Sequence, residues 1–173
     1  MSDTNGPATV ELLVTYMAMD APAAAASRPA PEGASVAVER LGIADYRALY
    51  RAVGEAVQWD ERLRLADAAL AAILEAPSTE IHVLRVGGAA VGFCELDLSG
   101  MPQIEIVHFG IVPAVQGRGL GPYLLDRALR AAWARAPERI WLHTDTNDHP
   151  GARATYERAG FAAYHSRMEH FPA

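Results

Sequence analysis

Apolar and polar positions along the chain recur with two different periods, and these periods predict the secondary structure. Runs of β-branched and apolar residues, bounded by Gly, Pro or polar residues, indicate strands. We expect strands at residues 8–19, 35–41, 80–86, 89–98, 103–112, 139–144 and 161–171. Apolar residues at helical spacing predict helices. We expect helices at residues 43–53, 61–74 and 120–133, and a short helix that begins at Asp148-His149-Pro150 and ends at Gly160.

The order of these elements defines the expected fold class. Strands and helices follow one another as β-β-α-α-β-β-β-α-β-α-β. The pair Gly87-Gly88 between two apolar runs is typical of a hairpin turn. A first half rich in hairpins, followed by β-α-β-α-β, predicts an α/β fold with a mixed sheet and helices on its faces. We expect residues 1–173 to form one domain, with an Ala/Pro-rich loop at residues 21–34.

The composition limits the possible partners of the protein, its reaction chemistry and its cellular compartment. A net charge of -6 argues against nucleic acid as the main partner. The single cysteine, Cys94, excludes an internal disulfide and fits a reducing, cytoplasmic setting. No apolar run is long enough to span a membrane, and the first residues lack the pattern of a signal peptide. All 15 basic residues are arginine, which excludes a Schiff-base lysine and a Walker-type phosphate lysine.

The most informative segment is residues 111–125, with the sequence IVPAVQGRGLGPYLL. An apolar strand runs into a loop with glycines at 117, 119 and 121, and a helix follows at once. The first N–H groups of a helix lack partners, so such a loop is typical of a phosphate-binding site. The G-x-G-x-G spacing does not fit a Rossmann loop, and the missing lysine excludes a Walker loop. On this segment alone, a glycine-rich turn without a ligand remains an alternative.

The residues around this loop resemble one family. Residues 116–121 (QGRGLG) match the Q/R-x-x-G-x-G/A pattern of the acetyl-CoA loop in the Gcn5-related N-acetyltransferase (GNAT) family. Residues 156–161 (YERAGF) look like its Y-x-x-x-G-F signature, and the run D-H-P at 148–150 resembles a bacterial subgroup. The resemblance, which covers residues 80–161, implies a mixed, largely antiparallel twisted sheet of six to seven strands with about four helices. It also implies acetyl transfer from acetyl-CoA to a primary amine of a small molecule or peptide. A non-catalytic acyl-CoA-binding or sensor module on the same fold is the alternative.

By this resemblance, the glycine loop and the strand before it bind acetyl-CoA. Backbone N–H groups of residues 117–122 are implied to hold the pyrophosphate, with Arg118 adding charge and Pro122 adding only shape. A strand N–H group is implied to polarise the thioester carbonyl. The position of the asparagine that contacts pantetheine in many members is His149 here, with Asn147 nearby as the other substitute. The implied acetyl-CoA-binding residues are Phe109, Gly110, Ile111, Gln116, Gly117, Arg118, Gly119, Leu120, Gly121, Pro122, Asn147 and His149.

An ammonium acceptor must lose a proton before it attacks, so the resemblance also implies a general base. Glu105 lies eleven positions before Gln116, the spacing of the glutamate base in the histone acetyltransferases of this family. Strict alternation along the strand puts Glu105 and Phe109 on one face and His108 on the other. His108 and Glu95 remain alternative bases.

The resemblance further implies a general acid. Tyr156 matches the tyrosine that protonates the leaving CoA thiolate in many family members, so Glu105 and Tyr156 are the predicted catalytic pair. Cys94 lies in mid-strand and is expected to be a core residue, which favours direct attack in a ternary complex over an acetyl-cysteine intermediate. Trp59 and Arg62 are candidates either for the acceptor site or for packing and surface positions. We expect no metal site, and a monomer or homodimer that binds acetyl-CoA and an amine.

Overall fold

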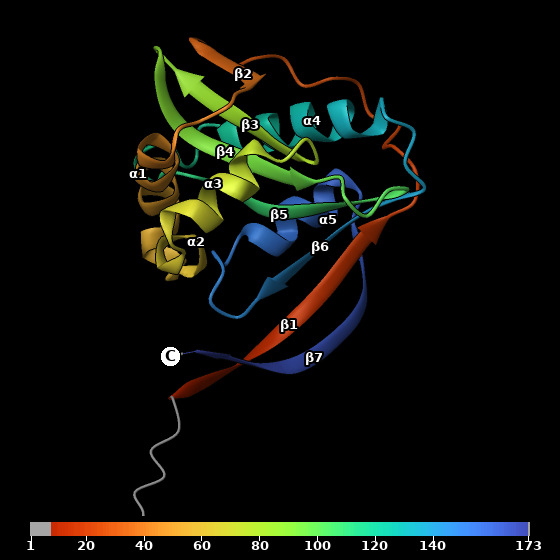
Figure 1. Cartoon of the computed structure of the whole chain (residues 1–173). Helices are drawn as coiled ribbons and strands as arrows, with labels where there is room; N and C mark the ends of the chain where they lie inside the picture. The colour runs from red at the N-terminus through yellow and green to blue at the C-terminus, as the bar shows by residue number, and fades with distance from the viewer. Residues whose placement is uncertain (1–7, 173) are drawn as a thin grey trace, which may run out of the picture.

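The computed structural model describes residues 8–172, which form one seven-stranded sheet with helices on both faces (Figure 1). The strands are β1 (Thr9–Met19), β2 (Ala34–Val38), β3 (Thr79–Val86), β4 (Ala89–Asp97), β5 (Gln103–Ile111), β6 (Arg139–Asp145) and β7 (Ala162–Pro172). The α-helices are α1 (Ile43–Gly54), α2 (Glu61–Arg64), α3 (Asp67–Glu75), α4 (Leu120–Trp133) and α5 (Ala152–Ala159), and short 3-10 helices cover Glu55–Val57 and Pro113–Val115. Every strand expected from the sequence is present close to its predicted position.

The sheet is mixed and mostly antiparallel, as predicted. Its strand order is β2-β3-β4-β5-β6-β1-β7, and only β5 and β6 run parallel to each other. The first strand, β1, therefore lies between two strands from the end of the described chain. Figure 1 shows the long β1–β7 pair extending beyond the rest of the sheet. Helices α1 to α3 lie on one side of the sheet, and α4 and α5 lie on the other (Figure 1).

Each face of the sheet has its own apolar core. On the side of α1, a stripe of Tyr46, Tyr50 and Val53 packs against Leu70 of α3 and Phe93 of β4. On the other side, α4 turns one apolar face to the sheet, which is the behaviour of an amphipathic helix that covers a core. The predicted stripe of α4 is fully confirmed as buried: Leu120, Leu124, Leu125, Ala128, Leu129 and Ala132.

The helix predicted over residues 61–74 is wrong as a single element. It is divided into α2 and α3, because Leu65 and Ala66 have extended backbone. Arg47 of α1 stabilises the break: its guanidinium donates to the Leu65 carbonyl at 2.8 Å and to Asp67 at 2.7 Å. A carbonyl at a helix end needs a partner from elsewhere, and Arg47 supplies one. Five α-helices therefore replace the four that were expected in residues 8–172.

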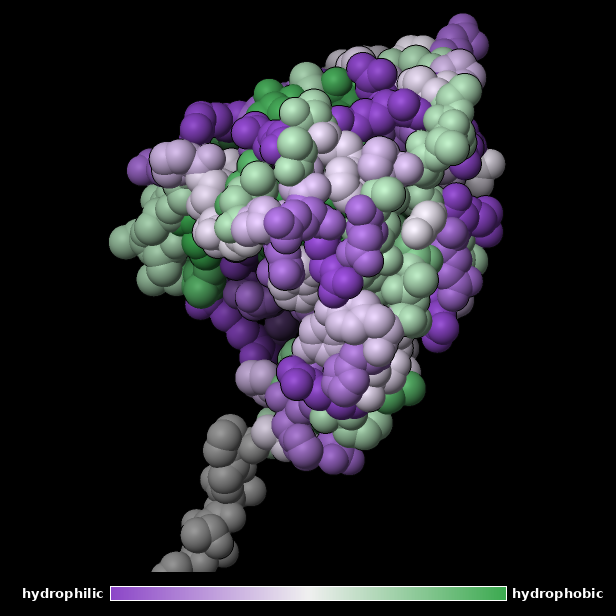
Figure 2. All heavy atoms as spheres, turned by 90° about the vertical axis from the view of Figure 1, so that its right-hand side faces the viewer, coloured by the Kyte–Doolittle hydropathy of each residue, from purple (hydrophilic) through white to green (hydrophobic). Residues whose placement is uncertain are grey.

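The surface of the molecule is mixed in character. On the face in Figure 2, hydrophilic residues in purple are interspersed with pale and green apolar ones. Exposed large apolar side chains occur on several elements, such as Leu13 on β1, Val38 on β2 and Met168 on β7. Within residues 8–172, none of the helices combines the length and the apolar character needed to cross a membrane.

The core on the α4 side predicts a large cost for truncation. Leu124 is 0% exposed, so Leu124→Ala is expected to lower the free energy of unfolding by about 2–5 kcal/mol through lost burial and a cavity. The matched control is Leu13→Ala, because Leu13 is 43% exposed and should lose little. Urea denaturation of both variants measures the difference, and equal losses would contradict this packing.

Candidate active site

Strands β5 and β6 separate soon after they begin. They pair only at Gln103 with Arg139, Ile104 with Ile140 and Glu105 with Trp141. Beyond Glu105, β5 continues to pair with β4 and β6 continues to pair with β1, so the two edges that face each other lose their partner. Unpaired backbone N–H and C=O groups need a hydrogen-bond partner, and an extended polar ligand between the strands can provide it.

A cavity of about 460 Å³ lies between β5 and the start of α4. We call it the donor cavity, because residues expected to bind the acetyl donor line it. The loop before α4 contains Gly117 (φ 76°) and Gly119 (φ 73°), in a left-handed conformation that other residues rarely adopt. Helix α4 begins at Leu120, its first turn has no acidic residue, and no side chain caps it. The first N–H groups of α4 are therefore available to an anion such as a phosphate.

Most residues predicted to bind acetyl-CoA line the donor cavity. They are Phe109, Gly110, Ile111, Gln116, Gly117, Gly119, Leu120, Gly121, Pro122 and His149. Arg118 is exposed and is not part of this lining. Asn147 lines a different cavity. It lies in a turn after β6, where its backbone N–H donates to the Asp145 carboxylate at 2.7 Å. Of the two candidates for the pantetheine contact, only His149 lies in the donor cavity.

Gly110 is required by the packing of helix α1 against the sheet. A Cβ atom at Gly110 would meet Val53 Cγ1 of α1 at 2.5 Å, so the glycine lets α1 approach the sheet closely. The bulge in β5 lies three residues earlier, at Val107.

A larger cavity of about 1020 Å³ adjoins the donor cavity. We call it the acceptor cavity, because Glu105, the expected base for the acceptor, lines it. Both cavities are lined by Val57, Trp59, Phe109, Asp148 and Tyr156. The indole N–H of Trp59 donates to Asp148 Oδ1 at 3.4 Å. This bond links the segment between α1 and α2 to the turn after β6. Trp59 and Asp148, which both line the two cavities, are thus joined across their boundary. Trp59 is therefore a lining residue as well as a packing residue.

The bulge in β5 decides which side chains enter the acceptor cavity. The register runs from Glu95–His108 to Leu96–Ile106, so Val107 is an extra residue without a partner. His108 consequently packs against Tyr50 and Trp59 on the α1 side, where Glu105 also lies, while Phe109 packs in the α4 core. The expectation from strict alternation, which put Glu105 with Phe109 and opposite His108, is wrong because the inserted residue shifts the phase of the strand.

Glu105 lies in the acceptor cavity with a perturbed carboxyl group. Partial burial raises the pKa of Glu105 to about 7, and the charges of Asp97, Glu61 and Glu95 raise it while that of Arg62 lowers it. These groups come from the two elements that face it, β4 and α2. A carboxyl group whose pKa lies near neutrality is well suited to accept a proton at physiological pH.

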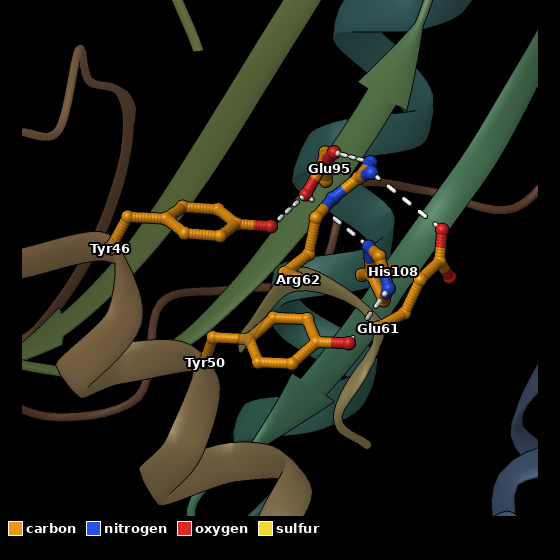
Figure 3. Close-up of polar contacts among 6 residues, drawn as sticks. All are labelled: Tyr46, Tyr50, Glu61, Arg62, Glu95 and His108. Atoms are coloured by element: carbon orange, nitrogen blue, oxygen red, sulfur yellow. Dashed lines mark hydrogen bonds and ion pairs between the residues drawn. The ribbon is translucent and has the colours of Figure 1, made fainter. Parts of the chain in front are cut away.

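Glu95 is the centre of a buried polar cluster (Figure 3). It is 1% exposed, and its oxygens lie 2.7 Å from Arg62 Nη2, 2.5 Å from the Tyr46 hydroxyl and 3.3 Å from His108 Nδ1. The other ring nitrogen of His108 lies 3.4 Å from the Tyr50 hydroxyl. Burial raises the pKa of Glu95, but His108 and Arg62 outweigh this effect and lower it to about 2.

This cluster changes the ranking of the candidate bases. The polar atoms of Glu95 and His108 are bound within the protein, whereas Glu105 has no hydrogen bond or ion pair with another side chain of residues 8–172. The sequence analysis missed Tyr46 and Tyr50 as members of the cluster. The one available signal was Glu95 itself, a charged residue in the middle of the apolar run VGFCEL.

Tyr156 of α5 stands at the boundary of the two cavities. Its ring packs against Phe109, with 5.7 Å between centroids, and against Phe161 at 6.0 Å. Tyr156 is 6% exposed, and burial raises the pKa of its hydroxyl, so this group stays protonated. Cys94, by contrast, is confirmed as a core residue, fully buried on the α4 side of the sheet.

Comparison with known proteins identifies the family. Residues 44–161 match the acetyltransferase (GNAT) family, and the chain belongs to it. The chain is 20% identical to a GCN5-related N-acetyltransferase structure from Sphaerobacter thermophilus, with a TM-score of 0.66 over 94% of this chain and 52% of that one. This likeness confirms the predicted fold. The D-H-P subgroup stays a prediction.

The chain also resembles two mycothiol acetyltransferases. The protein of Salinispora tropica is 35% identical over 117 residues, which are 65% of this chain and 34% of that protein. The protein of Beutenbergia cavernae is 46% identical over 57 residues, which are 33% of this chain and 19% of that protein. The chain therefore spans at most about a third of the length of these relatives.

The Glu95 cluster predicts a large effect of removing one charge. Glu95→Gln leaves Arg62 without its buried counter-charge, so we expect the free energy of unfolding to fall by about 3–5 kcal/mol. The control is Glu39→Gln, which removes the charge that pairs with Arg85. This ion pair is more exposed than the Arg62–Glu95 pair, so its loss should cost about 1 kcal/mol or less. Chemical denaturation measures both, and a small loss for Glu95→Gln would show that the pair is not stabilising.

Proposed function

We propose that the protein is an acetyl-CoA-dependent N-acetyltransferase that acetylates a primary amine of a small molecule or peptide. One observation carries the proposal: two cavities meet at Tyr156, the first lined by the glycine loop and the second by Glu105. Membership of the GNAT family and the names of the similar proteins support the same class of reaction.

The donor cavity suits the two polar parts of acetyl-CoA. N–H groups of residues 117, 119, 120 and 121 surround the pyrophosphate at the start of α4, where the helix dipole favours an anion. The unpaired edge of β5 over residues 109–111 binds the amides of the pantetheine arm. His149 lies beside this arm. Arg118, exposed on the same loop, adds positive charge near the phosphates.

The residues at the cavity boundary provide the acid–base chemistry. Acetyl-CoA supplies the activated acetyl group as a thioester. Glu105 removes a proton from the acceptor ammonium, and the amine nitrogen then forms its bond to the thioester carbonyl carbon. A β5 N–H group stabilises the negative charge that develops on the carbonyl oxygen. As the C–S bond breaks, Tyr156 donates its proton to the sulfur. The nitrogen loses its second proton, which restores the Tyr156 hydroxyl by way of solvent, and an amide and free CoA leave the site.

The role of Glu105 predicts the pH profile. The base works only when it is deprotonated, so kcat/KM should rise with pH and level off above a pKa of about 7. Glu105→Gln should lower kcat by about 10²–10⁴-fold and remove this acid limb. Release of the CoA thiol, measured against pH with a responsive amine, tests both statements. Glu138→Gln, outside both cavities, is the control, and an unchanged limb in Glu105→Gln would exclude this base.

The role of the glycine loop predicts ligand-dependent stability. Acetyl-CoA at about 100 times its dissociation constant should stabilise the protein by about 2.7 kcal/mol. Gly119→Ala forces a side chain into the left-handed conformation at φ 73°, so this variant should bind acetyl-CoA more weakly. Gly42→Ala, at φ -68° with open space around it, should not.

Two outcomes of the thermal and kinetic assays separate the alternatives. A protein that is not stabilised by millimolar acetyl-CoA does not bind this donor, and the proposal fails. A protein that is stabilised but releases no CoA thiol with any amine in a broad panel is an acyl-CoA-binding module. Only stabilisation together with thiol release supports the transferase.

A further inference from the structure

Strand β7 lies at one edge of the sheet, and among residues 8–172 its one neighbouring strand is β1. Figure 1 shows β1 on one side of β7 and no strand on the other. The outer edge of β7 therefore presents backbone N–H and C=O groups without a strand partner, which is a template for pairing with another chain. The opposite edge strand, β2, has five residues, and short edge strands limit such pairing. The eleven residues of β7 lack this protection.

Apolar side chains are concentrated beside this edge. Of the six large apolar side chains that are exposed in residues 8–172, four lie on β1 and β7: Val10, Leu13, Tyr164 and Met168. Met168 is 54% exposed, and its direct partner on β1 is Leu13. Exposed apolar side chains that gather in one place mark an interaction surface. A partner that fits this surface therefore offers both a strand edge and apolar side chains.

The charges of β7 leave room for further ion pairs. Arg167 and Glu169 lie on the same face of the strand, where Arg167 Nε donates to Glu169 Oε1 at 2.7 Å. The Tyr16 hydroxyl donates to the same carboxylate oxygen at 2.6 Å. Glu169 Oε2 can therefore accept from a cation on another strand. The side chain of Arg167 is 59% exposed, so it can reach across the edge of the sheet.

These two charges select one register for pairing with a second copy. A two-fold axis perpendicular to the sheet keeps the faces together, so the axis must pass beside a residue of β7 and its own copy. An axis at Arg167, or at Glu169, places a charge opposite its own copy, which destabilises a sheet. An axis at Met168 places Arg167 of each copy opposite Glu169 of the other, so two opposite-charge pairs form.

We propose that β7 is the interface of a two-fold dimer, in which the β7 strands of two copies pair antiparallel about Met168 and join the two sheets into one. The two Met168 side chains meet at the axis, and Leu13 of each copy continues the apolar row across the sheet. The pairing covers residues 165–171, which form an unbroken ladder with β1, because the irregularity of β7 lies at Tyr164. Pro172 has no N–H group to donate and ends the pairing.

The dimer brings a second copy to the acceptor cavity. Phe171 of β7 lines this cavity. In a ladder centred on Met168, residues 165 and 171 are direct partners, so His165 of the second copy lies opposite Phe171 on the same face. The second copy thus extends the wall of the acceptor cavity at β7. The pairing involves no substrate, so the inference stands or falls separately from the proposed function.

Sedimentation equilibrium over a range of concentrations tests the dimer. The wild type should pass from 18.6 kDa to twice this mass as its concentration rises. Arg167→Glu places like charges opposite each other in both pairs, so it should raise the dissociation constant of the dimer on the order of 10-fold. Arg167→Glu combined with Glu169→Arg should restore the wild-type constant. The control Arg153→Glu makes the same charge change on the exposed surface of α5 and should leave the constant unchanged.

A disulfide cross-link tests the register. On oxidation, Met168→Cys should give a covalent dimer, because the two positions face each other across the axis. Tyr164→Cys, at an equally exposed position away from the axis, should not. Cys94 does not compete, because it is 0% exposed. If the charge variants do not fold, the comparison of these two cysteine variants decides the question.

The results that overturn the inference are specific. A wild type that stays at 18.6 kDa at every concentration excludes the dimer. A dimer that Arg167→Glu leaves unchanged, or that the combined exchange does not restore, has another interface or register. Equal cross-linking of Met168→Cys and Tyr164→Cys likewise excludes the pairing about Met168.

Discussion

The divergence of β5 from β6 is the feature on which the site depends. After Glu105 the two parallel strands share no backbone bonds, although each remains paired on its other side. The bulge at Val107 accompanies this divergence and shifts the side-chain phase of β5. One backbone irregularity thus produces two results: an unpaired edge beside the glycine loop, and a face that carries both Glu105 and His108 toward the acceptor cavity.

The buried Glu95 cluster gives the acceptor cavity a fixed wall. It joins Tyr46 of α1, Arg62 of α2 and His108 of β5 to one carboxylate of β4. Breaking such a buried cluster is costly, because each polar group would be left without a partner. The cluster therefore holds α2 against the sheet and occupies the polar atoms of Glu95 and His108, which supports the proposal that Glu105 is the general base.

Local pattern predicted the elements well and long-range pairing poorly. The stripe of α4 and the loop at Gly117 and Gly119 were found because helical period and glycine spacing are local properties. The insertion of β1 between β6 and β7 was not found, since strand order depends on contacts over more than a hundred residues. The face of His108 was assigned wrongly because alternation assumes an unbroken ladder, which the bulge at Val107 interrupts.

The break between α2 and α3 also affects the wall of the acceptor cavity. Continuous helical pattern over residues 61–74 favours one helix, yet Arg47 binds the Leu65 carbonyl and the chain leaves the helical path there. A four-residue α2 is too short to be stable by itself. Its position is set instead by the bond from Arg62 to Glu95, which brings the neighbouring Glu61 to the cavity wall. The Glu61 carboxylate in the wall of the acceptor cavity is thus placed by a buried ion pair, and helix propensity alone does not place it.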